Sequence, residues 1–170
     1  TLYLAAADAP TGRELWKSDG TGAGTALVAE AFPGNGTSWV TDLTDVDGTL
    51  LYLAVENYVN GSEIWRCDGT TATRITTVPS GSQTGWARRM VRVGGLAYFN
   101  AGAADGLRHA LWRTDGTAAG TFRLGTDEPW GTIEFAGGAY WFSRRGGNWY
   151  DLWRSDGTVS GTALVRDLTP

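Results

Sequence analysis

Short apolar and aromatic runs alternate with glycine-rich polar segments along the whole chain. None of these runs has the 3.6-residue period of an amphipathic helix. The first run covers residues 2–6, and a cluster of turn-forming residues follows it at 8–12. Short runs bounded by glycine, proline and aspartate predict β-strands. The pattern recurs to the end of the chain and therefore predicts an all-β fold.

One segment recurs in four copies, with the form Glu-Leu-Trp-x-x-Asp-Gly-Thr in the first. The copies begin about 45 residues apart, which is the spacing of repeat architectures. They start at Glu14, Glu63, Ala110 and Asp151. Four short strands per repeat is typical of a β-propeller blade, and such small sheets bury their faces by packing against one another.

The sequence therefore predicts one domain, a β-propeller of about four four-stranded blades. The last repeat ends after three predicted strands, so the fourth blade is expected to be incomplete. Two alternatives stay open: a segment of a larger propeller, and a β-solenoid, whose coils are usually shorter than these repeats. The predicted domain is 1–170, and its blades are approximately 1–48, 49–95, 96–138 and 139–170.

The repeated motif has a structural interpretation. Its tryptophan is large enough to fill the space between blades. Its aspartate accepts backbone N–H groups where the strand turns, its glycine allows a left-handed backbone, and its threonine hydroxyl adds a local hydrogen bond. The residues assigned this role are Trp16, Asp19, Gly20, Thr21, Trp65, Asp68, Gly69, Thr70, Trp112, Asp115, Gly116, Thr117, Trp153, Asp156, Gly157 and Thr158.

Composition and charge narrow the range of partners. The net charge is −4, and there is no run of lysine or arginine, so nucleic acid is not an expected partner. No apolar stretch approaches the ~20 residues of a membrane-spanning helix, so membrane insertion is not expected. Cys67 is the only cysteine and takes the place of a serine or threonine in the other copies, which favours a small strand residue over a reactive thiol.

The residues give little support for catalysis. The one histidine, His109, lies near the third motif without a nucleophile signature beside it. Paired carboxylates could act in a hydrolase, but the sequence marks no pair among Asp42, Asp45, Glu56 and Glu134. We therefore expect no enzymatic activity and assign no catalytic residue.

No cofactor and no metal site are expected. Calcium is the less favoured alternative, because the four Asp-Gly-Thr loops offer oxygen ligands but only one carboxylate each. The basic residue that follows each tryptophan could contribute to an anion site; the simpler interpretation is a cationic stem lying over aromatic surface. These residues are Lys17, Arg66, Arg113 and Arg154.

Tryptophans outside the motif are the candidate ligand-binding residues. Trp39, Trp86 and Trp130 recur with a similar spacing before the fourth predicted strand of three repeats, and Trp149 lies in a glycine-rich loop. Exposed aromatic rings suit sugar rings and apolar peptide groups. The alternative is that the rings cap the outer edges of the blades.

The motif resembles the ELWxxDGT repeat of large secreted bacterial proteins. Its second half, Gly-Thr-x-Leu-Val, is present at residues 24–28 and 161–165. Repeat two departs from the second half of the motif, where Thr73 replaces the glycine. Repeat three departs from the first half, where Ala110 replaces the glutamate. The resemblance implies a repeat scaffold that is secreted or displayed on a bacterial cell surface, and it brings no catalytic residues with it.

Two functions follow as expectations. The first is a non-catalytic extracellular scaffold or adhesion component that mediates protein assembly or surface attachment, with self-association through open strand edges. The second is a multivalent carbohydrate-binding propeller that uses the loop tryptophans. The expected partners are accordingly other protein chains or surface glycans.

Overall fold

The structure is a computed structural model, and it describes residues 1–34, 36–56, 61–76, 87–102, 109–125, 129–144 and 150–168. Within these ranges all regular structure is β, with fifteen strands and no helix. The prediction of an all-β fold is confirmed.

The strands form four small antiparallel sheets, and in each sheet the strands pair in the order of the sequence. The first sheet holds β1 (Leu2–Asp8), β2 (Gly12–Ser18) and β3 (Ala26–Ala29). The second holds β4 (Thr41–Val46), β5 (Thr49–Val55), β6 (Ser62–Cys67) and β7 (Ala72–Thr76). The third holds β8 (Arg88–Val93), β9 (Leu96–Ala101), β10 (Ala110–Thr114) and β11 (Phe122–Arg123). The fourth holds β12 (Pro129–Phe135), β13 (Gly138–Arg144), β14 (Tyr150–Ser155) and β15 (Ala163–Arg166).

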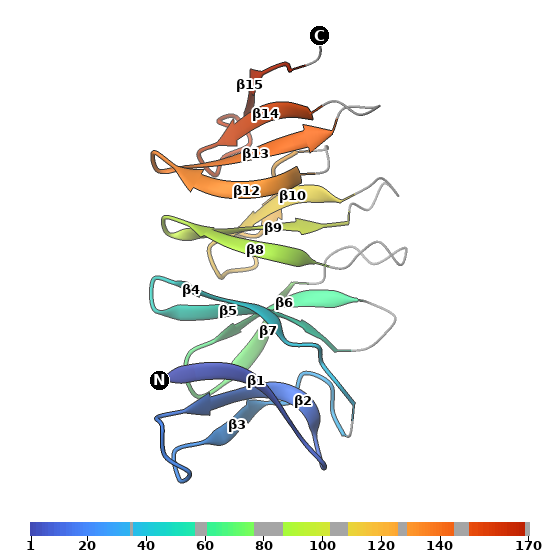
Figure 1. Cartoon of the computed structure of the whole chain (residues 1–170), viewed down its shortest axis with the longest axis vertical. Helices are drawn as coiled ribbons and strands as arrows, with labels where there is room; N and C mark the ends of the chain where they lie inside the picture. Colours follow the sequence, from blue (N-terminus) through green and yellow to red (C-terminus); the bar gives the residue numbers. More distant parts are fainter. Residues whose placement is uncertain are drawn as a thin grey trace.

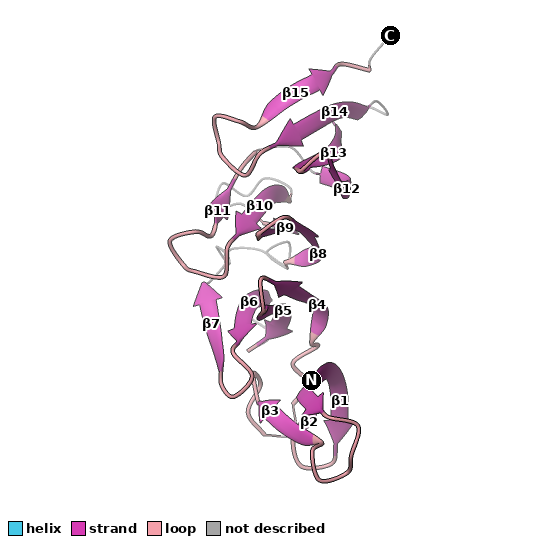
Figure 2. Cartoon of the chain, turned by 90° about the vertical axis from the view of Figure 1, so that its left-hand side faces the viewer, coloured by secondary structure: helices cyan, strands magenta, loops and turns pink. Residues whose placement is uncertain are grey.

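The four sheets follow one another along the long axis of the molecule, with the first and fourth sheets at opposite ends (Figure 1). Strands β4, β8 and β12 lie along one side of this stack, and β7, β11 and β15 lie along the other (Figure 2). Contacts between sheets agree, since β8 touches both β4 and β12. Strands β4, β8 and β12 are therefore the inner strands of propeller-type blades. In each blade the following strands lie progressively farther out.

The predicted blade boundaries need a correction. The turn at Asp47 and Gly48 joins Val46 directly to Thr49, so β4 pairs with β5 and belongs to the second sheet. A tight hairpin forces antiparallel pairing of its two strands, whereas longer connections carry the chain to the next sheet. The predicted fourth strand of each repeat therefore opens the following sheet. The prediction that the fourth blade is incomplete is wrong: it has four strands, and the first sheet has three.

The hydrophobic core lies between the sheets, in three layers. Leu15 and Tyr52 lie between the first and second sheets, and Leu53 and Phe99 lie between the second and third. A third layer, which includes Trp141, joins the third sheet to the fourth. In this way each inner sheet buries both of its faces.

Motif tryptophans take part in these layers. Trp65, Trp112 and Trp153 each pack against one layer and stack on the aromatic residue opposite in the neighbouring strand. The ring centroids are 6.4 Å apart for Tyr52 and Trp65, 6.3 Å for Phe99 and Trp112, and 6.5 Å for Trp141 and Trp153. The large rings therefore fill the space between blades, which is the role that the sequence predicts for them.

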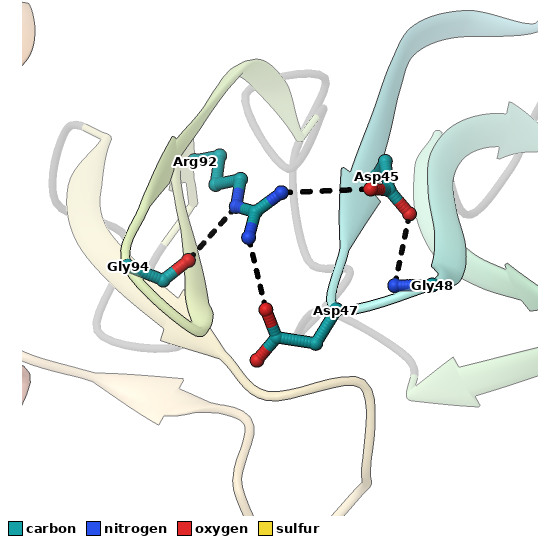
Figure 3. Close-up of polar contacts among 5 residues, drawn as sticks. All are labelled: Asp45, Asp47, Gly48, Arg92 and Gly94. Carbon is teal, nitrogen blue, oxygen red and sulfur yellow. Dashed lines mark hydrogen bonds and ion pairs between the residues drawn. The ribbon is translucent and has the colours of Figure 1, made fainter.

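A charged contact links the inner strands of the second and third sheets (Figure 3). Arg92 donates to Asp47 at 2.9 Å and to the carbonyl oxygen of Gly94 at 2.9 Å, and it lies 3.5 Å from Asp45. Asp45 in turn accepts the N–H of Gly48. All three charged side chains are well exposed, so this network is expected to contribute no more than about 1 kcal/mol.

Candidate functional site: repeat loops and an apolar end face

The Asp-Gly-Thr loops are held by their own side chains. In the first loop, the Asp19 carboxylate accepts the N–H of Thr21 at 2.9 Å and its hydroxyl at 2.8 Å. The Thr21 hydroxyl oxygen accepts the N–H of Gly24 at 2.9 Å, and Ser18 accepts the N–H of Gly20 at 3.0 Å. The third and fourth loops repeat this pattern around Asp115 and Asp156, so the motif closes a turn once per sheet.

The second loop departs from the pattern, as its sequence does. Asp68 accepts four hydrogen bonds, from the N–H and hydroxyl groups of Thr70 and of Thr71. These hydrogen bonds stabilise the ionised carboxylate and hold the pKa of Asp68 far below its ordinary value. The bonds from the backbone N–H groups of Thr71 and Thr70 contribute most to this lowering. Cys67 is buried, and its sulfur accepts the N–H of Gly69 at 3.3 Å, which matches a small structural residue.

The glycine five residues after the motif aspartate in the first, third and fourth loops is required for a steric reason. A methyl group on Gly24 would overlap the carboxylate of Asp19, and the same overlap occurs at Gly120 and Gly161. By contrast, a methyl group on Gly22 in the first loop would meet no atom within 4 Å. The glycine of the Gly-Thr half of the motif is therefore required by the approach of the aspartate.

Replacing Gly24 by alanine is expected to lower the free energy of unfolding by roughly 1–3 kcal/mol, because the added methyl group displaces the Asp19 carboxylate from its hydrogen bonds. Gly22→Ala in the same loop serves as the matched control and should leave stability nearly unchanged. Urea unfolding of both variants measures the difference. Equal stability of the two variants would contradict this account of the loop.

These loops give no support to calcium binding. In each of the four loops, Oδ1 of the aspartate accepts the N–H of the threonine two residues later. In the part of the chain that the structure describes, no group of three or more histidine, cysteine or acidic residues is arranged to hold a metal ion.

The residues considered for catalysis have separate partners. Asp42 accepts the N–H of Met90 at 3.2 Å, and Glu56 forms an ion pair with Arg74. Arg88 lies 3.1 Å from Nδ1 of His109. Asp45 contacts Arg92, as described above. The contacts recorded for these side chains are thus to cations and backbone groups in different parts of the stack.

Basic residues after the motif tryptophans bind protein groups. Lys17 donates to the carbonyl oxygen of Gly69 in the next sheet at 2.8 Å. The Arg113 guanidinium lies 4.2 Å from the ring centre of Phe122. These two contacts match the simpler interpretation, in which the cations pack on protein surface.

Trp39 is an exposed ring on a constrained backbone. Its relative exposure is 53%, while its neighbours Ser38 and Val40 are buried. Ser38 donates to the carbonyl oxygen of Arg13 and accepts the N–H of Val55. Trp39 itself has a positive φ of 49°, which is uncommon for a bulky residue. The anchored neighbours therefore turn the indole ring outward.

Trp130 does not occupy the position of Trp39, which corrects the predicted repeat of loop tryptophans. Strand pairing aligns Trp130, opposite Phe142, with Thr41, opposite Leu53. Trp39 lies two residues before Thr41. Counting back from the hairpin glycines, rather than between tryptophans, would have shown this difference. Trp86 and Trp149 lie outside the described residues.

Trp130 belongs instead to an apolar surface on the outer face of the fourth sheet, which we call the C-terminal end face. Paired positions in adjacent strands share a face, so the strand registers define its members. They are Trp130, Ile133, Phe135, Tyr140, Phe142, Tyr150 and Leu152.

Equivalent positions in the second and third sheets are buried. Val46 and Val93 are 5% and 4% exposed, whereas Phe135, at the same position of the fourth sheet, is 65% exposed. Leu53 is fully buried, whereas its counterpart Phe142 is 44% exposed. In the second and third sheets, the next sheet along the stack packs over these positions. No sheet in the described part of this chain packs over them in the fourth sheet, so the C-terminal end face has the apolar composition of a core layer but is exposed.

A shallow apolar hollow of about 310 Å³ lies on this face, lined by Trp130, Phe142 and Tyr150. The guanidinium of Arg89 sits 4.8 Å from the ring centre of Trp130 and covers one side of the indole. A second hollow of about 210 Å³ lies nearer the hairpin, where Tyr140 and Arg154 are among the lining residues. The face is thus contoured as well as apolar.

Comparison with known proteins bears on the fold. No protein-family model matches the chain, and no curated protein matches it. Among solved structures, the chain is similar to the crystal structure of TolB from Acinetobacter baumannii, a β-propeller protein, with a TM-score of 0.55 and 16% sequence identity. The match covers 99% of this chain and 47% of the TolB chain, so the chain spans about half the length of that protein.

The sheet topology and this likeness define the class: the chain has a propeller-type fold of four packed β-sheets. At 16% identity, the likeness extends to the fold alone. The described part of the chain contains no helix that is long and apolar enough to cross a membrane.

Proposed function

We propose that this chain is a non-catalytic repeat scaffold that mediates protein assembly, in the secreted or cell-surface setting implied by its resemblance to the ELWxxDGT repeat. The observation that carries the proposal is the C-terminal end face, where Phe135 and Phe142 are exposed at positions that are buried in the second and third sheets. Apolar patches of this kind mark surfaces that bind other proteins, membranes or ligands, and assembly with other chains uses the first of these.

The remaining residues support an assembly role over a chemical one. The motif side chains are used in closing loops and filling the layers between sheets, as Asp19 and Trp65 illustrate. Sheet edges add a second means of association, because an edge strand presents unpaired backbone groups to another chain.

Light scattering at several protein concentrations tests this proposal. The weight-average mass should rise above that of the 18.1 kDa monomer as concentration increases. Exposed apolar surface leaves water on association, so moderate salt should not abolish the effect, as it would for charged contacts. A monomer mass at every concentration would refute self-assembly.

Carbohydrate binding is the second candidate, and two observations favour it. The hollow lined by Trp130, Phe142 and Tyr150 offers aromatic surface to an apolar sugar face. Trp39 presents a second exposed ring from the segment that precedes β4, which fits several weak sites on one chain.

A glycan panel separates the two candidates. If the tryptophans bind sugars, Trp130→Ala and Trp39→Ala should each weaken glycan binding while the mass in solution stays the same. If the end face serves assembly, Trp130→Ala should lower the mass, and the panel should give no signal with the wild-type chain. Trp65→Phe, within the core layers, is the control for general effects of replacing an indole.

A further inference from the structure

The stack has a second uncovered face, on the first sheet, which we call the N-terminal end face. Leu4 pairs with Trp16 as Tyr52 pairs with Trp65, so Leu2 and Leu4 occupy the positions of Leu50 and Tyr52. The strand register places Leu2, Leu4, Ala6, Glu14, Trp16 and Ser18 on this face. Glu14 is buried there and accepts the N–H groups of Ala31 and Phe32. In the later sheets this face packs against the preceding sheet.

Leu2 and Leu4 are less buried than their counterparts in the later sheets, and Leu4 is partly buried where Tyr52 is fully buried. Leu2 is 62% exposed, whereas its counterparts Leu50, Ala97 and Ala139 are all buried. The two ends of the stack are therefore the two complementary halves of the layer that occurs three times inside it.

The motif glycines show how one half recognises the other. A methyl group on Gly69 would lie 3.3 Å from the Tyr3 hydroxyl of the preceding sheet, and one on Gly157 would lie 3.1 Å from that of Tyr98. Leu51 approaches Gly116 in the same way, at 3.5 Å. Each of these loops is thus approached by a side chain at this position of the sheet before it, and Gly157 is also approached by Leu96.

Gly20 and Tyr140 are the unmatched members of this series. Gly20 is the motif glycine of the first sheet, and a methyl group there would meet no atom within 4 Å. Tyr140 occupies the position of Leu51 and Tyr98 in the fourth sheet, where it lines a hollow together with Arg154. Arg154 occupies the position of Lys17, which donates to the carbonyl oxygen of Gly69.

We propose that a second copy of this chain packs head to tail on the first, with its N-terminal end face against the C-terminal end face. This inference rests on the assembly function proposed above and names both the partner and the surface. Tyr140 then covers Gly20 of the second copy, and Arg154 donates to the carbonyl oxygen of that glycine. Phe135 and Phe142 are buried against Leu2 and Leu4 of the second copy.

A contact of this kind joins two different surfaces, so it can repeat from copy to copy. It gives a closed ring where the rotation returns to the start, and a fibre where it does not. Either product uses the same contact, and blocking one end face on every copy stops both.

Two charged variants test the contact by complementation. Phe142→Asp disables the C-terminal end face, and Leu2→Asp disables the N-terminal end face, because each places an unpaired charge in an apolar contact. Alone, each variant should stay monomeric or associate at least about tenfold more weakly than wild type. An equimolar mixture should form a heterodimer, since each variant keeps the half that the other has lost.

Sedimentation velocity of the wild type, both variants and their mixture gives distinct outcomes. Suppose that the wild type associates. If Leu2→Asp then associates as fully as the wild type, or if the mixture forms no heterodimer, the head-to-tail contact is overturned and the proposed assembly function remains. A wild type that is monomeric at all concentrations overturns both. Val159→Asp, at an exposed apolar side chain in a loop, is the control and should associate as wild type does. Phe135→Asp repeats the test at a second position if Phe142→Asp does not fold.

Discussion

Leu53→Ala is expected to lower the free energy of unfolding by about 2–5 kcal/mol. The Leu53 side chain is fully buried between the second and third sheets, next to Phe99. Truncation removes apolar contacts and leaves a cavity. The neighbouring strands fill this cavity only in part, because their backbone hydrogen bonds hold them in place. Guanidinium unfolding at a concentration low enough to keep the chain monomeric measures the effect.

Phe142→Ala is the matched control, because Phe142 occupies the same position in the fourth sheet. The side chain is 44% exposed, so the loss in the monomer should be about 1 kcal/mol or less, although a larger side chain is removed. A loss as large as that of Leu53→Ala would mean that this face is covered within one chain. The head-to-tail contact would then have no free surface.

Trp141→Ala is expected to destabilise the fourth sheet by about 3–5 kcal/mol. Trp141 is 3% exposed, stacks on Trp153 and belongs to the layer that joins the third and fourth sheets. In a stack of repeats each unit is stabilised by its own fold and by its neighbours. Loss of the ring should therefore release the fourth sheet before the other three, which gives a separate early unfolding transition.

Hydrogen exchange locates this transition. Backbone N–H groups of β13 and β14 should lose protection in Trp141→Ala, while those of β5 and β6 keep it. Trp130→Ala removes a ring of the same kind from the opposite face of the same sheet and should leave protection nearly unchanged, because that ring is 44% exposed. Uniform loss of protection over all four sheets would show that the chain unfolds as a single unit instead.

The sequence by itself determined the repeat and the local structure. Alternating apolar and glycine-rich segments predicted the strands, and the hairpin at Asp47 and Gly48 was recognisable from its residues. The loop interactions of Asp19 with Thr21 also follow from the sequence, because they join residues two positions apart. Local hydrogen bonds and turns depend on neighbouring residues, which a sequence displays directly.

Only the tertiary structure decided which strands share a sheet and which faces are covered. The predicted boundary between the first two blades, at residues 48 and 49, falls within this hairpin, although pairing places both of its strands in one sheet. Trp39 and Trp130 looked equivalent in spacing, yet their positions relative to the strand ladders differ. Phe135 and Val93 are alike as apolar strand residues, but one is exposed and the other buried. Burial depends on the next sheet in space, and the periodicity of a strand is the same whether or not that sheet is present.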